Sequence, residues 1–182
     1  MDMNRILRAP ETAEGLDRPA AKLVTAARTL FGDGRVSDWA RGSSLGHPLH
    51  PILVTMPVGA WSSAAVLRTV GRTEEARRLV LIGLLATPPA VAVGLAEFQD
   101  LDAAQRRVGL VHAAMNAVAT VLFSAAYRSL DDRAATALGA AGLAAMGAGG
   151  AFGGHLAYAL GAGVHRWQHA PSTLDSPAAP VP

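Results

Sequence analysis

The sequence predicts an all-α fold, a four-helix transmembrane bundle preceded by a short amphipathic N-terminal helix. The first observation is that four windows contain no Asp, Glu, Lys or Arg, namely 51–67, 79–96, 108–127 and 134–164. Their lengths are close to or above the roughly 20 residues that a helix needs to cross a bilayer. The second is that a soluble bundle would instead interleave charges at a 3.6-residue period. The third is an apolar content dominated by Ala and Gly, which lets membrane helices approach closely.

Composition excludes several classes of function. The chain has no cysteine, so it holds no disulfide, iron–sulfur cluster or thiolate metal site of its own. The net charge is +2, but no basic run carries interleaved aromatic residues, so nucleic-acid binding is not expected. Residues 1–14 lack the apolar core of a signal peptide, and we expect the first spanning helix to direct insertion. We find no nucleophile elbow and no phosphate-binding glycine loop, which leaves enzyme status open.

Three segments are predicted along the chain: a polar N-terminal segment with the amphipathic helix over 1–44, a four-span membrane domain over 45–166, and a disordered tail over 167–182. Asp17 is the expected N-cap of the amphipathic helix, and Gly32 ends it. This helix is predicted either to lie on the membrane surface or to pack on a soluble partner. Trp39 and Arg41, which follow it, are typical of a membrane interface.

The four spans are expected at about 52–70, 79–96, 108–129 and 135–162. Pro57 and the pair Pro88-Pro89 lie inside spans, which membrane bundles tolerate. An even number of spans puts both termini on one side. That side carries ten Lys and Arg residues against six on the other, although near the spans the count is five against six. The total predicts a cell-membrane protein with both termini in the cytoplasm.

All six histidines are predicted to lie toward the same side of the membrane as the termini: His47, His50, His112, His155, His165 and His169. His47 and His50 stand in the stretch HPLHP, directly before the first span. His112 is about one turn inside the third span and His155 is in the last third of the fourth. Glu97, at the end of the second span, is expected on the same side. The alternative for His50 is that it only anchors a turn at the headgroups, and His165 and His169 fit surface positions.

Polar and small residues mark the faces of the third and fourth spans. A polar stripe, which lipid cannot satisfy, recurs every four residues through His112, Asn116, Thr120 and Ser124. GAGGAFGGH places Gly149 four residues before Gly153, and Gly150 four before Gly154. Two overlapping small-residue faces predict close helix contact, and they leave room beside His155 for a flat cofactor as an alternative.

Four stretches together resemble a bacterial membrane-protein family called domain of unknown function 2231: GHPLHPILVTMPVGAW, GLAEF, RRVGLVHAAMN and GAFGGHLAYALGAGV, over about 45–165. The resemblance implies four spans and no established activity. Related domains occur joined to Rieske-type iron–sulfur domains, which implies a redox setting. The family pattern has Asp-Trp where this chain has Glu97-Phe98, so the carboxylate is displaced by one methylene, about 1.5 Å.

Three functional hypotheses follow. The first is a redox component that binds haem b through His112 and His155, with His50 as the alternate ligand and Arg107 beside a propionate. In a variant, a transition metal is held by His50, His112, His155 and Glu97. The second is a non-catalytic subunit or scaffold with a redox or membrane-complex partner. The third, a proton path, is less favoured because the polar residues stop at one side.

Overall fold

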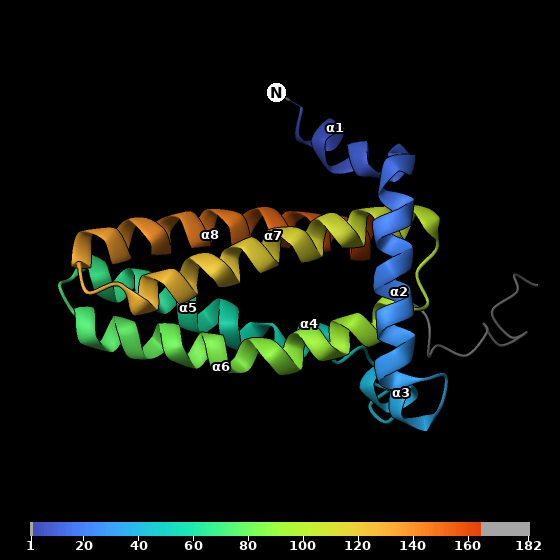
Figure 1. Ribbon diagram of the computed structural model, residues 1–182, viewed down its shortest axis with the longest axis horizontal. Coiled ribbons are helices and arrows are strands. Elements are labelled where there is room, and N and C mark those ends of the chain that lie inside the picture. Colours follow the sequence, from blue (N-terminus) through green and yellow to red (C-terminus); the bar gives the residue numbers. More distant parts are fainter. Residues whose placement is uncertain (1, 165–182) are drawn as a thin grey trace, which may run out of the picture.

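The computed structural model describes residues 2–164, which are all helical apart from turns and loops (Figure 1). Four stretches are long and apolar enough to cross a membrane: His50–Thr69, Thr73–Phe98, Ala103–Arg128 and Asp132–Ala159. They form two antiparallel hairpins that lie one on the other. One hairpin joins α5 (Thr55–Thr69) to α6 (Thr73–Phe98), and the second joins α7 (Ala103–Arg128) to α8 (Asp132–Gly154). The predicted four-helix transmembrane bundle is therefore confirmed.

The N-terminal segment folds over one end of this bundle. It contains α1 (Met3–Arg8), two short 3₁₀ turns, η1 (Ala9–Thr12) and η2 (Glu14–Leu16), then α2 (Asp17–Phe31) and α3 (Arg35–Ala40). Figure 1 shows α2 running across the bundle axis, with α1 and α3 at its two ends. The apolar face of α2 is buried against the ends of α6 and α7, where Ala20 and Val24 meet Phe98 and Leu101. The buried part of the apolar face of α2, which was predicted to contact the membrane or a partner protein, thus packs on the bundle of the same chain.

Helix boundaries differ from the predicted ones where polar residues cap or extend a span. α6 and α7 begin about five residues before the predicted starts at 79 and 108. The prediction counted uncharged residues, and the first turns of both helices contain charged residues. Asp102 and Gln105 form a capping box that starts α7, with Gln105 N–H donating to Asp102 Oδ1 over 2.9 Å. The fourth span stops at Ala159, the end of the single π-helical stretch η3 (His155–Ala159). Gly161 and Gly163, both with positive φ, then turn the chain.

The first span is broken near its start. α4 (His50–Leu53) is followed at Val54 by a break before α5. Pro57 lacks the N–H that would bond the Leu53 carbonyl, which accounts for the interruption. His50 belongs to the first turn of α4 with Pro51 just inside it. The residue before this proline is thus helical, although a following proline disfavours the helical conformation. The predicted disordered tail, His165 and His169 lie outside the described residues.

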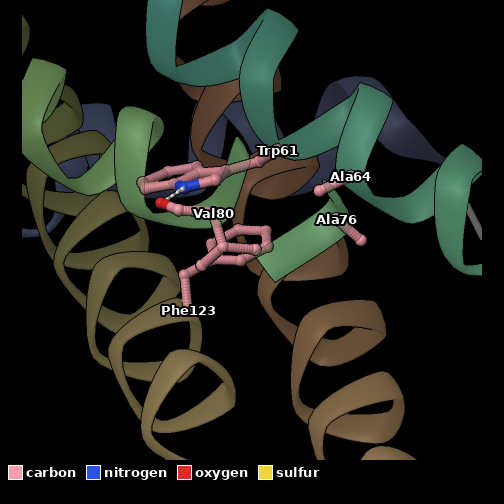
Figure 2. Close-up of a cluster of buried hydrophobic side chains, with 5 residues drawn as sticks. All are labelled: Trp61, Ala64, Ala76, Val80 and Phe123. Carbon is pink, nitrogen blue, oxygen red and sulfur yellow. Dashed lines mark hydrogen bonds between the residues drawn. The ribbon is translucent and has the colours of Figure 1, made fainter. Parts of the chain in front are cut away.

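The half of the bundle away from α2 is held by an aromatic stack between the hairpins (Figure 2). Trp61 of α5 and Phe123 of α7 lie with ring centroids 4.2 Å apart and planes inclined by 16°. The Trp61 indole N–H donates to the Val80 carbonyl over 3.2 Å. A methyl carbon on Gly83 would lie 2.3 Å from Nε1 of Trp61, so the indole needs a glycine at this position.

We predict that Gly83→Ala destabilises the bundle. The added methyl group collides with the indole and must displace it, and overpacking of this kind costs about 1–3 kcal/mol. Thermal unfolding in mild detergent, followed by circular dichroism and Trp fluorescence, measures the loss. Gly59→Ala on α5 is the matched control, because no atom lies within 4 Å of its new methyl group. Equal melting temperatures for the two variants would contradict the role of Gly83.

Candidate functional site

Two histidines from different hairpins meet inside the bundle. His50 comes from the first turn of α4 and His112 from the third turn of α7. Their ring centroids are 6.0 Å apart and the rings are nearly perpendicular, at 82°. We call these two residues the histidine pair. Of the histidines predicted as ligands, these are the two that the structure brings into ring contact.

A backbone carbonyl holds each ring of the histidine pair. Nδ1 of His50 lies 2.9 Å from the Ala90 carbonyl of α6, and Nδ1 of His112 lies 2.8 Å from the Gly149 carbonyl of α8. A carbonyl oxygen accepts only, so Nδ1 carries the proton and donates it in both rings. In a neutral imidazole the other nitrogen, Nε2, then keeps its lone pair. Both residues therefore share one tautomer, in which Nε2 is an acceptor. The Asn116 amide nitrogen lies 3.5 Å from Nε2 of His112.

Glycines on the neighbouring helices make room for these side chains. A methyl carbon on Gly94 would lie 2.7 Å from Nδ1 of His50, and one on Gly153 would lie 2.8 Å from Nδ1 of His112. A methyl carbon on Gly149 would likewise lie 2.7 Å from Nδ2 of Asn116. The same amide nitrogen donates to the His112 carbonyl over 2.8 Å. The predicted glycine face of α8 that contains Gly149 and Gly153 thus packs against His112 and Asn116 of the polar stripe on α7. The space beside Gly153 is filled by the His112 ring.

His155 has a different partner. Its Nε2 lies 2.8 Å from Oε1 of Glu11, and the imidazole is almost wholly buried. Glu11 belongs to η1 in the N-terminal segment, so this contact joins the two ends of the described chain. The structure does not place His155 in ring contact with His112, its partner in the haem hypothesis. Its role as a ligand remains a prediction.

Arg107, predicted beside a propionate, binds the N-terminal segment as well. Its guanidinium donates to both carboxylate oxygens of Asp17, over 2.6 and 2.8 Å, and to the Glu11 carbonyl over 2.8 Å. These hydrogen bonds and the positive charge hold the pKa of Asp17 below its usual value. Asp17 lies in the first turn of α2 and is not its N-cap, because Arg107 takes its carboxylate. We call Glu11, Asp17, Arg107 and His155 the N-terminal tether.

Glu97 lies where three segments converge. A methyl carbon on Gly163 would lie 3.8 Å from Oε2 of Glu97 and 3.4 Å from Cγ of Pro48. The end of α6, the HPLHP stretch and the turn after η3 are therefore neighbours. Within residues 2–164, no three His, Asp or Glu side chains are grouped closely enough to hold a metal ion. The four-ligand set of His50, His112, His155 and Glu97 is thus not gathered in this structure, and it stays a prediction.

Sequence reasoning missed the contacts that dock the N-terminal segment. Besides the N-terminal tether, Arg41 bonds Asp100 over 2.5 Å and Asp38 over 2.7 Å, which fixes α3 beside the end of α6. Gln105 donates to the Leu160 carbonyl over 2.8 Å and ties η3 to α7. Most of these pairs are separated by 55 to 144 residues, beyond any local pattern.

Comparison with known proteins gives one match. The model of a family described as "Predicted membrane protein (DUF2231)" matches residues 46–166, which is well over half of the chain. No curated protein and no solved structure matches the sequence.

We predict that Asp17→Asn loosens α2 from the bundle end, because it removes the charge that Arg107 binds. Cleavage by trypsin at Lys22 and Arg28 in detergent should accelerate. The same contact should respond to pH: since folding lowers the pKa of Asp17, its stabilisation is full above the ordinary value near 4 and is lost as the pH falls through the lowered value. Hydrogen exchange of α2 at pH 3 and pH 6 measures this.

The matched control for this experiment is Asp33→Asn, an exposed carboxylate just beyond α2. It changes the net charge equally without touching Arg107. If both variants are cleaved at the wild-type rate, Asp17 does not hold the segment in place.

Proposed function

The chain belongs to the DUF2231 family of predicted membrane proteins, and we propose that it binds a transition-metal ion through His50 and His112 as a redox component of the membrane. One observation carries this proposal: both rings of the histidine pair donate from Nδ1 to backbone carbonyls. Metal-binding histidines are commonly oriented by such a hydrogen bond, which leaves Nε2 for the metal. The residues of the site come from α4, α6, α7 and α8, so the packing of these helices sets the positions of both rings.

The spacing of the rings supports a shared ion. A metal at about 2 Å from two imidazole nitrogens places the ring centroids about 5–6.5 Å apart, depending on the angle at the metal. The observed separation of 6.0 Å falls in this range. Imidazole ligands suit Zn, Fe, Cu and Ni. Glu97 and His155 are the further ligands that we propose, and His155 reaches the ion only if it leaves Glu11.

Haem b remains the second version of this proposal. His112 and His155 are its proposed axial ligands, with His50 as the alternate and Arg107 at a propionate. A haem in this position must compete with contacts that already engage these side chains, since Arg107 binds Asp17 and His155 binds Glu11. In the metal-ion version, Arg107 keeps its contact with Asp17, and only the further ligand His155 has to leave its partner, so this version is favoured.

The first experiment is elemental analysis together with a visible absorption spectrum of the protein purified in mild detergent from haem-supplemented cells. We expect stoichiometric metal that is lost in His50→Ala and in His112→Ala. His47→Ala is the matched control, because this exposed histidine lies three residues from His50. A Soret band that disappears in His112→Ala or His155→Ala would instead establish the haem version.

A colourless protein without metal would contradict both versions. It would favour the alternative function, a non-catalytic membrane subunit, and purification of bound partners would follow. Circular dichroism of each variant shows whether it inserts and folds, so that loss of the ligand is separated from loss of the protein.

We also propose that the end of the bundle covered by α2 faces the cytoplasm. The support is the excess of cations on this side, ten against six along the whole chain. Because the chain has no cysteine, single cysteines report sidedness cleanly. Ala26→Cys on the exposed face of α2 should be protected from an impermeant maleimide in intact cells, whereas Leu130→Cys in the opposite loop should react. The reverse labelling pattern would overturn this orientation.

A further inference from the structure

The helix α3 lies beside the membrane-spanning part of α6. Ala40 of α3 is packed with Val93 and Ala96 in one buried cluster. Val93 is five residues before the end of α6, which corresponds to about 7–8 Å along the helix axis. Since α6 crosses the membrane, α3 is held at the depth of the lipid headgroups and the uppermost acyl carbons.

Several large apolar side chains are exposed on the outer surface of this region. Ser37 and Ala40 face inward and are buried, whereas Val36 and Trp39, on the other side of α3, are 65% and 62% exposed. Leu30 before α3 and Leu45 after it are 69% and 57% exposed. Four large apolar side chains within sixteen residues are thus exposed, including Leu30 at the end of α2, although α2 buries Ala20, Val24 and Ala27.

Two arginines beside these apolar side chains are placed to reach lipid phosphates. Arg28 and Arg35 are exposed at the end of α2 and the start of α3. The nearby carboxylates are Asp38, which Arg41 binds together with Asp100, and Asp33, which is exposed. Arginine side chains close to an anionic membrane surface are attracted to it.

We propose that Leu30, Val36, Trp39 and Leu45 form a lipid-docking surface that inserts into the headgroup layer of the surrounding membrane, with Arg28 and Arg35 facing lipid phosphates. Trp is suited to this position because its ring is apolar while its N–H bonds interfacial water or phosphate. The surface continues onto the first span, where Ile52 and Met56 are also exposed. The N-terminal segment is thereby held by the bundle on one side and by lipid on the other.

Quenching of Trp39 by brominated lipids tests the proposal. The protein is reconstituted in vesicles of phosphatidylcholine and phosphatidylglycerol, with bromine placed near the top or near the end of the acyl chain. The contribution of Trp39 is the difference in emission between wild type and Trp39→Phe. We expect it to be quenched mainly by the shallow bromines and to be protected from aqueous iodide.

The matched control is Trp61→Phe, because Trp61 is buried between the hairpins and its contribution should show no preference for shallow bromines. If iodide quenches Trp39 and brominated lipid does not, the surface faces water and the proposal is wrong. It is equally wrong if neither quencher acts, because protein then covers the surface.

The role of the arginines is tested separately in the same vesicles. Arg28→Gln with Arg35→Gln should weaken the shallow quenching of Trp39 when phosphatidylglycerol is present, and should have less effect in phosphatidylcholine alone. Arg133→Gln, at the opposite end of the bundle, is the control. Equal quenching in both lipid mixtures for every variant would contradict the assignment of phosphate contacts to Arg28 and Arg35.

Discussion

The four spanning helices are held together by ring and amide side chains that pack directly against glycines of the neighbouring helix. Lipid tails are as apolar as the helix surfaces, so association in a membrane depends on close packing and internal hydrogen bonds. In this chain the close contacts between helices are alike. In each, a side chain of one helix occupies the space that the Cβ of any residue other than glycine would take on the neighbouring helix. The pairs are Trp61 on Gly83, His50 on Gly94, Phe123 on Gly142, Asn116 on Gly149 and His112 on Gly153.

The same constraint explains how two imidazoles are accommodated in a spanning bundle. A glycine lets the ring reach the backbone of the neighbouring helix, where a carbonyl accepts its proton. Trp61 and Phe123 show that apolar rings fill such spaces equally well. A histidine is therefore not required for packing. What distinguishes His50 and His112 is a second nitrogen, and this excess over the structural need favours a site that uses it.

The number of spans and their approximate limits could be predicted, because a long uncharged window is a local property of the chain. The end of the bundle at which His50, His112 and His155 lie follows from the same count. Which histidines meet could not be predicted, because that depends on the rotation of each helix about its axis. The ring contact joins His112 to His50, whereas His155 is turned toward Glu11, 144 residues away. Asp17 and Arg107 pair across 90 residues in the same way.

The two ends of the bundle are built differently. At one end the hairpins close through short turns around Gly71 and Leu130. At the other, α2 and α3 are fixed to α6, α7 and η3 by buried apolar residues and by charged groups that the spanning helices contribute. Arg107 and His155 serve this attachment, which leaves the histidine pair deeper in the same half of the bundle. A movement of the N-terminal segment would therefore act on α7, the helix that carries both Arg107 and His112.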